Sequence, residues 1–189
     1  MEKLLTIVVP AYNVEKYIKN CLDSLIEISV LRSLEILVVN DGSTDRTLQI
    51  AKTYENKYPY SIKVLSKENG GHGSAINYAI PRATGKYFKV LDGDDWVDKS
   101  QLPKFVELLK HTHSDMISND FNLVDDRTMK VTKRRKAASN SYHYNREWGF
   151  AEAVMDPLVT IHSMTIRTDI LQKNDIRVDE HCFYEDQEY

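Results

Sequence analysis

The chain has 189 residues, a length that fits one folded domain with a hydrophobic core of its own. Hydrophobic residues make up 42% of it and charged residues 28%, which excludes a disordered chain and a collagen-like repeat. The 25 Lys and Arg residues are outnumbered by 28 Asp and Glu residues, and the resulting net charge of −3 disfavours a dedicated nucleic-acid-binding protein.

The sequence carries no recognisable targeting or membrane-spanning signal. No stretch approaches the ~20 apolar residues that a transmembrane helix needs, and the first residues lack a signal-peptide pattern. Cys21 and Cys182 have no metal-binding spacing, and Cys21 lies in an apolar helical pattern, as a buried thiol does. Because unpatterned thiols are typical of a reducing compartment, we expect a cytoplasmic protein.

Up to residue 95 the sequence alternates short apolar runs with amphipathic helical patterns. Near-continuous, β-branched runs predict buried strands at residues 4–9, 34–39, 62–65 and 87–91. Apolar residues at helical spacing predict helices around 18–26, 48–54 and 75–80, with Ser43 or Thr44 capping the second. Repeated strand–helix–strand units predict a parallel sheet with helices on both faces.

Beyond residue 98 the pattern is less regular. We expect a helix over 102–109 capped by Ser100, a strand at 115–118, a hairpin within 121–131, a helix over 146–155, a strand over 159–166 and a helical turn at 169–173. Residues 127–136 hold six basic side chains. We interpret this basic run as a solvated loop; the alternative is contact with an anionic lipid head group or a diphosphate.

An acidic cluster, Asp92-Gly93-Asp94-Asp95, directly follows the fourth predicted strand. Ligands of open α/β sheets bind outside the carboxyl ends of the strands, where this cluster lies. Mg²⁺ and Mn²⁺ accept oxygen ligands, and acids two residues apart on an extended segment point the same way. Asp92 and Asp94 are therefore candidate ligands of one divalent cation; the alternative is a solvated acidic turn that caps the next helix.

Three other segments are weaker signals when each is taken alone. Residues 40–45 place a carboxylate at a strand end, although a turn with an N-cap explains this segment better when it is taken alone. The glycine-rich residues 67–74 can cradle a phosphate with backbone N–H groups or form a plain turn. Residues 183–187 offer a general base or an acidic surface turn. His162, in a strand-like run, is interpreted as a buried interior histidine.

The order of these motifs along the chain is more specific than any one of them. A Pro-Ala-Tyr-Asn segment after the first strand, Asn-Asp-Gly-Ser-Thr-Asp after the second, Asn-Gly-Gly before the third helix and Leu-Asp-Gly-Asp-Asp after the fourth strand strongly resemble family 2 glycosyltransferases. The resemblance is close over residues 4–98 and looser beyond. It implies a GT-A fold, a Rossmann-like three-layer α/β/α sandwich with a mostly parallel central sheet.

The resemblance also implies an activity. Such enzymes transfer a sugar from a nucleotide diphosphate donor, often a UDP-sugar, to an acceptor hydroxyl, and they invert the anomeric centre. The acceptor that it implies is a saccharide or a lipid-linked saccharide of the cell surface, reached by a protein that associates peripherally with the inner face of the membrane. We expect one domain over 1–189, with a nucleotide-sugar-binding half at 1–98 and an acceptor-side half at 99–189.

The resemblance also implies roles for individual residues of this sequence. The nucleotide-sugar-binding positions are Pro10, Ala11, Tyr12, Asn13, Asp41, Asn69, Gly71, Asp92 and Gly93. Asp41 matches the acid that hydrogen-bonds the uracil N–H. Asp94, with Asp92, matches the D-x-D pair that holds Mn²⁺ or Mg²⁺ on the diphosphate. Asp186 matches the catalytic base, with Glu185 as the second candidate.

The sequence departs from the family pattern in two places. Ile76 stands where the glycine loop of the family usually continues to an Arg, which puts a donor contact there in question. The chain also ends at Tyr189, three residues after Asp186, so we expect an incomplete acceptor side. The alternatives are a non-catalytic nucleotide-sugar-binding module and, less favoured, a sugar-nucleotide pyrophosphorylase, whose basic glycine loop after the first strand is absent.

Overall fold

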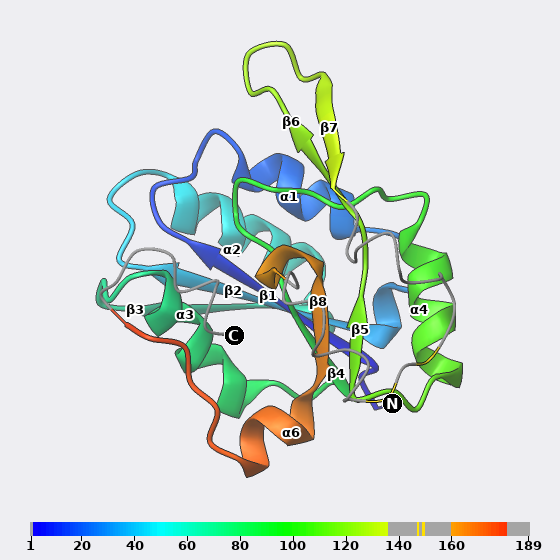
Figure 1. Cartoon of the computed structure of the whole chain (residues 1–189). Helices are drawn as coiled ribbons and strands as arrows, with labels where there is room; N and C mark the ends of the chain where they lie inside the picture. Colours follow the sequence, from blue (N-terminus) through cyan, green and yellow to red (C-terminus); the bar gives the residue numbers. More distant parts are fainter. Residues whose placement is uncertain (1, 136–146, 148, 150–159, 181–189) are drawn as a thin grey trace.

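The computed structural model describes residues 2–135, 147, 149 and 160–180 (Figure 1). Six of the described strands form one sheet in the order β3-β2-β1-β4-β8-β5. These strands are β1 (Leu5–Ala11), β2 (Leu34–Asp41), β3 (Ile62–Lys67), β4 (Tyr87–Val90), β5 (Met116–Ser118) and β8 (Met164–Arg167). The first four pair in parallel, as expected, whereas β8 lies antiparallel between β4 and β5. The sheet is therefore mostly parallel.

Helices cover both faces of the sheet: in Figure 1, α1 (Ile18–Leu25) and α2 (Thr47–Lys57) lie on one side of β1 and β2, and α3 (His72–Ala79) lies on the other. On one face α1, α2 and α4 (Leu102–His111) pack over Leu5, Ile7 and Val9 of β1. On the other face α3, η2 (Ile80–Arg82) and α6 (Thr168–Lys173) pack over Val8 and Phe88. Alternate residues of β1 thus enter opposite cores, which explains its continuous apolar sequence.

The fold differs from the sequence prediction at the helix caps. Neither Ser43 nor Thr44 caps α2, which begins at Thr47 after the N-cap Arg46. The backbone N–H of Thr44 instead donates to Asn13. Ser100 does not cap α4 either, because its hydroxyl donates to Asp98.

The predicted strand over 159–166 is also wrong in part. Residues Ile161–Ser163 form a 3-10 turn, η3, and only Met164–Arg167 is a strand. The hydroxyl and the N–H of Ser163 both donate to the carbonyl of Thr160, a local hydrogen-bonding pattern that competes with a ladder. The helix predicted over 146–155 lies almost wholly outside the described residues.

The predicted hairpin is confirmed as β6 (Phe121–Val124) and β7 (Val131–Arg135), a separate two-stranded antiparallel sheet. Its turn is closed by Asp125, which accepts hydrogen bonds from the N–H and hydroxyl of Thr128. The described part of the basic run is therefore mostly a strand rather than a loop, although every residue of β7 is exposed.

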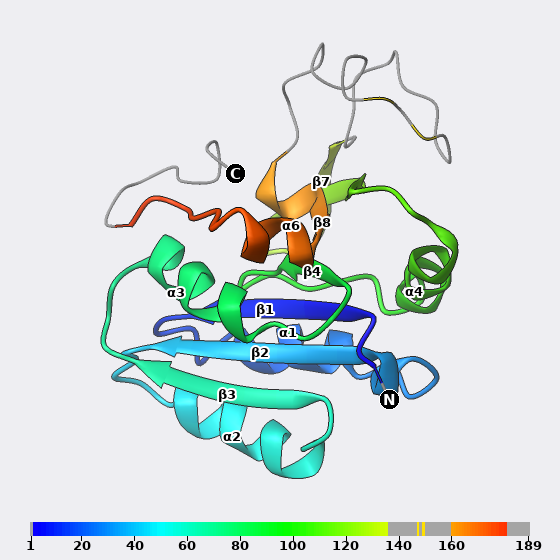
Figure 2. The same ribbon diagram turned by 90° about the horizontal axis from the view of Figure 1, so that it is seen from below.

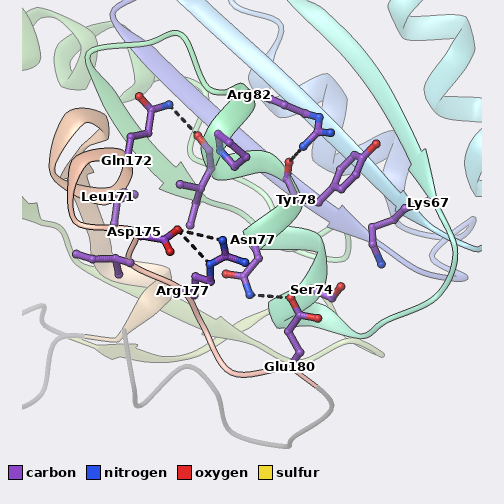
Figure 3. Close-up of a pocket in the computed structure, with 13 residues that line it drawn as sticks. Lys67, Ser74, Asn77, Tyr78, Arg82, Leu171, Gln172, Asp175, Arg177 and Glu180 are labelled. Carbon is purple, nitrogen blue, oxygen red and sulfur yellow. Dashed lines mark hydrogen bonds and ion pairs between the residues drawn. The ribbon is translucent and has the colours of Figure 1, made fainter.

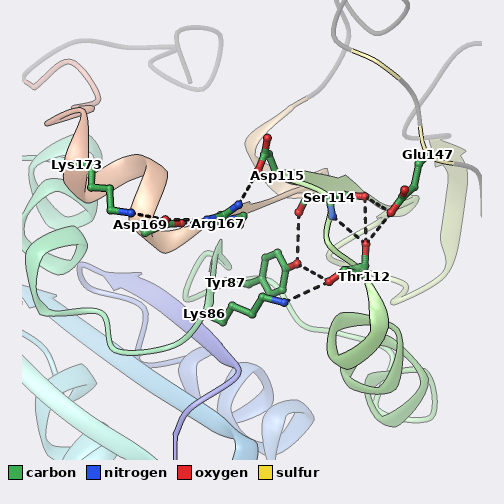
Figure 4. Close-up of polar contacts among 9 residues, drawn as sticks. All are labelled: Lys86, Tyr87, Thr112, Ser114, Asp115, Glu147, Arg167, Asp169 and Lys173. Carbon is green, nitrogen blue, oxygen red and sulfur yellow. Dashed lines mark hydrogen bonds and ion pairs between the residues drawn. The ribbon is translucent and has the colours of Figure 1, made fainter.

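Polar contacts tie the second half of the chain to the amino end of β4 (Figure 4). The hydroxyl of Tyr87 donates toward the carbonyls of Thr112 and Ser114, at 3.2 and 3.3 Å. Arg167 of β8 pairs with Asp115 and with Asp169. The hydrogen bond from the Arg167 guanidinium lowers the pKa of the Asp169 carboxyl to about 2. Within the described residues, no helix has the length and apolarity needed to span a membrane.

Candidate active site

The candidate site lies where the parallel strands β1, β2 and β4 end. The arrowheads of β2 and β3 mark this carboxyl edge in Figure 2. Pro10 and Ala11 are the buried last residues of β1, and Tyr12 directly after them has 51% of its surface exposed. Gly93 closes the edge from β4, since its N–H donates to the carbonyl of Pro10 at 3.1 Å.

Asn13 joins the loops that follow β1 and β2. It adopts a left-handed backbone conformation, with φ of 52°, which Asn tolerates better than most residues. Its side-chain oxygen accepts from the N–H groups of Thr44 and Asp45, and its own N–H donates to Ser43. Asn13 therefore fixes the geometry of the edge next to Tyr12.

Asp41, at the end of β2, anchors the glycine loop. Its buried carboxylate accepts from the N–H groups of Gly70 and Gly71 and from the ammonium of Lys67 at 2.8 Å. Its carbonyl accepts from the side chain of Asn69. Gly71 has φ of 89°, so a side chain there would be strained. The predicted contact of Asp41 with a base is untested; its oxygens already hold the loop.

Asp92 lies between two histidines from distant parts of the chain. The Nε2 atom of His72 is 2.7 Å from Asp92 Oδ1, and Nδ1 of His162 is 3.8 Å from Asp92 Oδ2. The segment is a turn rather than extended, because the N–H of Asp95 donates to the carbonyl of Asp92 at 2.9 Å. This turn brings Asp95 back beside Asp92.

Asp92, Asp95 and His162 form a group in which one ligand atom of each lies within 4.8 Å of the others. Asp94, the predicted partner of Asp92, is exposed and outside this group. The expectation that Asp92 and Asp94 point the same way assumed an extended backbone, which the turn replaces. A metal-binding role for Asp94 remains a prediction.

The two carboxylates of this group have opposite pKa shifts. Burial opposes ionisation of Asp92, but the hydrogen bond from His72 and the positive charges of His72 and His162 hold its pKa below the ordinary value. Burial and the neighbouring carboxylates of Asp92 and Asp94 raise the pKa of Asp95. A divalent cation between Asp92 and Asp95 would relieve this repulsion.

Lys89 of β4 holds the backbone of His162 in place. Its ammonium is buried and donates to the carbonyl of His162 at 3.0 Å and to the side chain of Asn119 at 3.1 Å. Burial lowers the pKa of Lys89 to about 8. The ring of Phe121 lies 5.8 Å from the His162 ring, centroid to centroid. His162 is thus held from two sides and is not the enclosed interior histidine that was expected.

The sequence alone did not point to three residues that lie beside Asp92 or His162: His72, Asp95 and Lys89. His72 carried no recognised signal within the glycine loop, and Asp95 was passed over in favour of Asp94. Lys89 did have one signal, since it is the single charged residue in an otherwise apolar strand run. Ile76, where the sequence departs from the family pattern, is a residue of α3. Its side chain is wholly buried in the core that α3 covers, so it does not face the site.

A cavity of about 430 Å³ with a mixed polar and apolar lining lies between α3, η2 and the segment that follows α6 (Figure 3). Arg82 stacks on the ring of Tyr78 at 3.7 Å in this cavity, and Arg177 pairs with Asp175. Lys67, which contacts Asp41, lines the cavity as well. The cavity therefore lies along α3, and Asp92 is not among its lining residues.

The predicted base lies outside the described residues, as does Cys182. Glu185 and Asp186 follow the segment 176–180, which packs along α3. Asn77 of α3 holds this segment through two hydrogen bonds, from the N–H of Val178 at 2.9 Å and to its carbonyl at 2.7 Å.

Comparison with known proteins identifies the family. Residues 6–173 match the sequence profile described as glycosyl transferase family 2, and the chain belongs to this family. It is 39% identical over 121 residues to the uncharacterized glycosyltransferase EpsJ of Bacillus subtilis, covering 64% of this chain and 35% of EpsJ. It is 36% identical over 113 residues to the poly(ribitol-phosphate) beta-N-acetylglucosaminyltransferase TarS of Staphylococcus aureus, covering 59% of this chain and 20% of TarS. The chain thus spans about a third and a fifth of these two relatives.

Solved structures agree with the assignment. The crystal structure of TarS residues 1–349 in complex with UDP-GlcNAc superposes with a TM-score of 0.74 and 29% identity, over 97% of this chain and 51% of that one. A mannosyltransferase of Pyrobaculum calidifontis in complex with GDP-Man and Mn²⁺ has a TM-score of 0.67, and at 18% identity it shows the fold alone. The fold is GT-A, as expected.

Proposed function

We propose that this chain is the donor-binding part of an inverting glycosyltransferase that moves a sugar from a UDP-sugar to a hydroxyl of a cell-surface saccharide. The observation that carries the proposal is the hydrogen bond between His72 and Asp92, which joins the glycine loop to the acidic turn at the carboxyl edge. The similar TarS structure holds UDP-GlcNAc, which supports a UDP-sugar as the donor.

The residues present fit a divalent cation. Two carboxylates and an imidazole within 4.8 Å are a donor set that suits Mn²⁺ better than Mg²⁺, which prefers oxygen ligands alone. Asp92, Asp95 and His162 would hold the cation, with Asp94 as the further candidate. When bound, it supplies positive charge that offsets the charge developing on the departing diphosphate.

The remaining roles belong to the chain itself. Asp41 holds the glycine loop in place at the carboxyl edge, because its carboxylate accepts the N–H groups of Gly70 and Gly71. Asp186, or Glu185 in its place, takes the proton of the attacking hydroxyl. We propose a saccharide or lipid-linked saccharide as acceptor, at the cytoplasmic face of the membrane.

Donor hydrolysis tests the proposal without knowledge of the acceptor. The release of UDP from UDP-GlcNAc is measured with and without Mn²⁺, on the wild type and on Asp92→Asn. Slow release that needs both Mn²⁺ and Asp92 is the expected result. A protein that binds UDP-GlcNAc but never turns it over, even with saccharide acceptors present, would instead be a binding module.

A further inference from the structure

The β6–β7 hairpin stands apart from the rest of the molecule. Figure 1 shows it projecting beyond the main sheet and α1. Its two strands pair only with each other, and every residue of β7 is exposed. The main core clusters include none of its residues. The hairpin is therefore not required to complete the fold, and its sequence is free to serve another purpose.

The hairpin is strongly basic. Residues 121–135 contain five basic and two acidic side chains, a net charge of +3 in a chain of −3, so the other residues together carry −6. Arg134 pairs with Asp120 at 2.8 Å. The other four basic residues make no ion pair with any described residue: Arg127, Lys130, Lys133 and Arg135. This charge separation is typical of a surface that meets an anionic partner.

Apolar side chains are exposed among these charges. Met129 has 58% of its surface exposed, Val131 59% and Leu123 40%. Leu123 pairs with Lys133 across the strands, so an apolar and a basic side chain lie side by side. Met129 forms the tip with φ of 56°, a backbone conformation that a bulky residue adopts at a cost. The turn thus presents this apolar side chain to solvent at the end of the hairpin.

We infer that the β6–β7 hairpin binds the surface of an anionic lipid bilayer. Lysine and arginine side chains attract anionic head groups, and neighbouring apolar side chains enter the interface between head groups and acyl chains. A soluble polyanion would be held by the charges but would leave Met129 and Val131 in water. The combination of exposed cations with exposed apolar residues thus favours a bilayer over a nucleic acid or another soluble polyanion.

The hairpin base is continuous with the candidate active site. Phe121, its first residue, packs against the ring of His162. At the other end of the hairpin, the hydroxyl of Tyr17, in the loop after β1, donates to Asp126 of the turn at 3.2 Å. A bilayer bound by the hairpin would therefore lie close to the carboxyl edge, where a membrane-borne hydroxyl could reach it. The binding itself is independent of catalysis.

Vesicle flotation tests the inference on the intact protein. The protein is mixed with vesicles of phosphatidylcholine alone or of phosphatidylcholine with phosphatidylglycerol. We expect flotation only with the anionic vesicles and its loss at high salt. Equal flotation with both kinds of vesicle, or none with either, would overturn the inference.

Matched variants locate the contact. Lys130→Gln with Lys133→Gln removes two hairpin charges and should lower the partition coefficient roughly 25-fold, at about fivefold per cation. Lys52→Gln with Lys57→Gln removes two exposed charges from α2, which lies beside the edge strand β3 in Figure 2, and should change it little. Equal losses in both double variants would show non-specific charge attraction and contradict the assignment.

A third variant separates a bilayer from a soluble polyanion. Met129→Asn removes the apolar tip and suits the left-handed backbone, so the fold is retained, which a melting curve verifies. It should weaken vesicle binding severalfold and leave binding to inorganic polyphosphate unchanged. If the variant bound vesicles as well as the wild type, and polyphosphate competed fully with them, the hairpin would be a soluble-polyanion site.

Discussion

Asp92 is the residue on which the candidate site depends most. Its two carboxylate oxygens face different histidines, His72 from the glycine loop and His162 from the turn before β8. His72 makes the shorter contact, and this hydrogen bond fixes the carboxylate so that the other oxygen points toward His162. A residue that orients a metal ligand in this way commonly changes metal affinity by 10- to 100-fold when it is removed.

Replacing His72 therefore tests whether it positions Asp92. We expect His72→Ala to weaken Mn²⁺ binding about tenfold while the melting temperature stays close to that of the wild type. Calorimetric titration with Mn²⁺ alone measures this directly. His113→Ala, at an exposed histidine after α4, is the matched control and should bind Mn²⁺ like the wild type. Unchanged affinity in His72→Ala would mean that Asp92 needs no such support.

Glu35 provides a pH-dependent test of the core of the sheet. Burial opposes its ionisation, but hydrogen bonds from the N–H of Thr84 and the hydroxyl of Thr6 hold the pKa of this carboxyl below its ordinary 4.5. At pH values between the lowered pKa of the folded protein and 4.5, the carboxyl of Glu35 is protonated in the unfolded chain but ionised in the folded chain. The stabilisation from Glu35 is therefore fully present above pH 4.5 and is lost as the pH falls below it.

Glu35→Gln should lower the free energy of unfolding at pH 7 by about 1–3 kcal/mol and flatten its fall below pH 4.5. Urea unfolding at a series of pH values measures both effects. Glu68→Gln, at an exposed carboxylate, is the control and should follow the wild type. A Glu35→Gln variant with the same pH dependence as the wild type would show that Glu35 does not stabilise the fold in this way.

Sequence reasoning identifies residues of this site when their roles are local. Asp92 and Asp41 follow apolar strand runs directly, so their place at the carboxyl edge could be predicted. Asp95 could not be chosen over Asp94, because the choice depends on a turn closed by one backbone hydrogen bond. His162 reaches Asp92 across 70 residues of chain, and no pattern in a single sequence records that approach.

At the scale of elements, α3 connects the glycine loop to the segment that leads to the predicted base. Asn77 clamps Val178 by two hydrogen bonds. Gly73 allows the close approach, because a Cβ atom there would lie 2.1 Å from the carbonyl oxygen of Asp179. The course of residues 176–180 along α3 therefore depends on these two positions.

Asn77→Ala should loosen this segment. Removing both hydrogen bonds leaves the N–H and the carbonyl of Val178 unpaired, which should cost about 1–3 kcal/mol. We expect amide hydrogen exchange of residues 176–180 to accelerate while exchange in β1 and β2 is unchanged. Asn174→Ala, which removes an exposed side chain after α6, is the matched control. Equal protection in Asn77→Ala and the wild type would contradict the clamp.

The elements differ in how well their sequences predict them. The parallel strands are buried on both faces and have nearly continuous apolar sequences, so their positions could be predicted from the sequence to within a few residues. β8 is short and only partly buried, and its antiparallel place beside β4 depends on residues far away in the sequence. The hairpin was predicted from its turn residues alone, but its exposure required the structure.

At the scale of the whole molecule, the two halves of the chain share one sheet. β8 covers the edge of β4 that β1 leaves open. Lys89 of β4 donates to Asn119, His162 and Met164, which all belong to the second half. Residues 1–98 taken alone would expose that edge and leave this buried ammonium without its acceptors.

The full chain should therefore unfold in one cooperative transition, and a fragment of residues 1–98 should not fold stably. Urea unfolding followed by circular dichroism and by tryptophan fluorescence should give coincident curves for the full chain. A fragment 1–98 with a dispersed NMR spectrum, or two separate transitions in the full chain, would show that the halves are independent domains.

We expect the carboxyl edge to bind a nucleotide diphosphate through a divalent cation held by the acidic turn. The measurement that tests it most directly is calorimetry of UDP binding, with and without Mn²⁺, on the wild type and on Asp92→Asn, Asp95→Asn and Asp94→Asn. We predict Mn²⁺-dependent binding that is lost in Asp92→Asn and weakened at least about tenfold in Asp95→Asn. Binding of equal strength in all four proteins, with or without Mn²⁺, would contradict the claim.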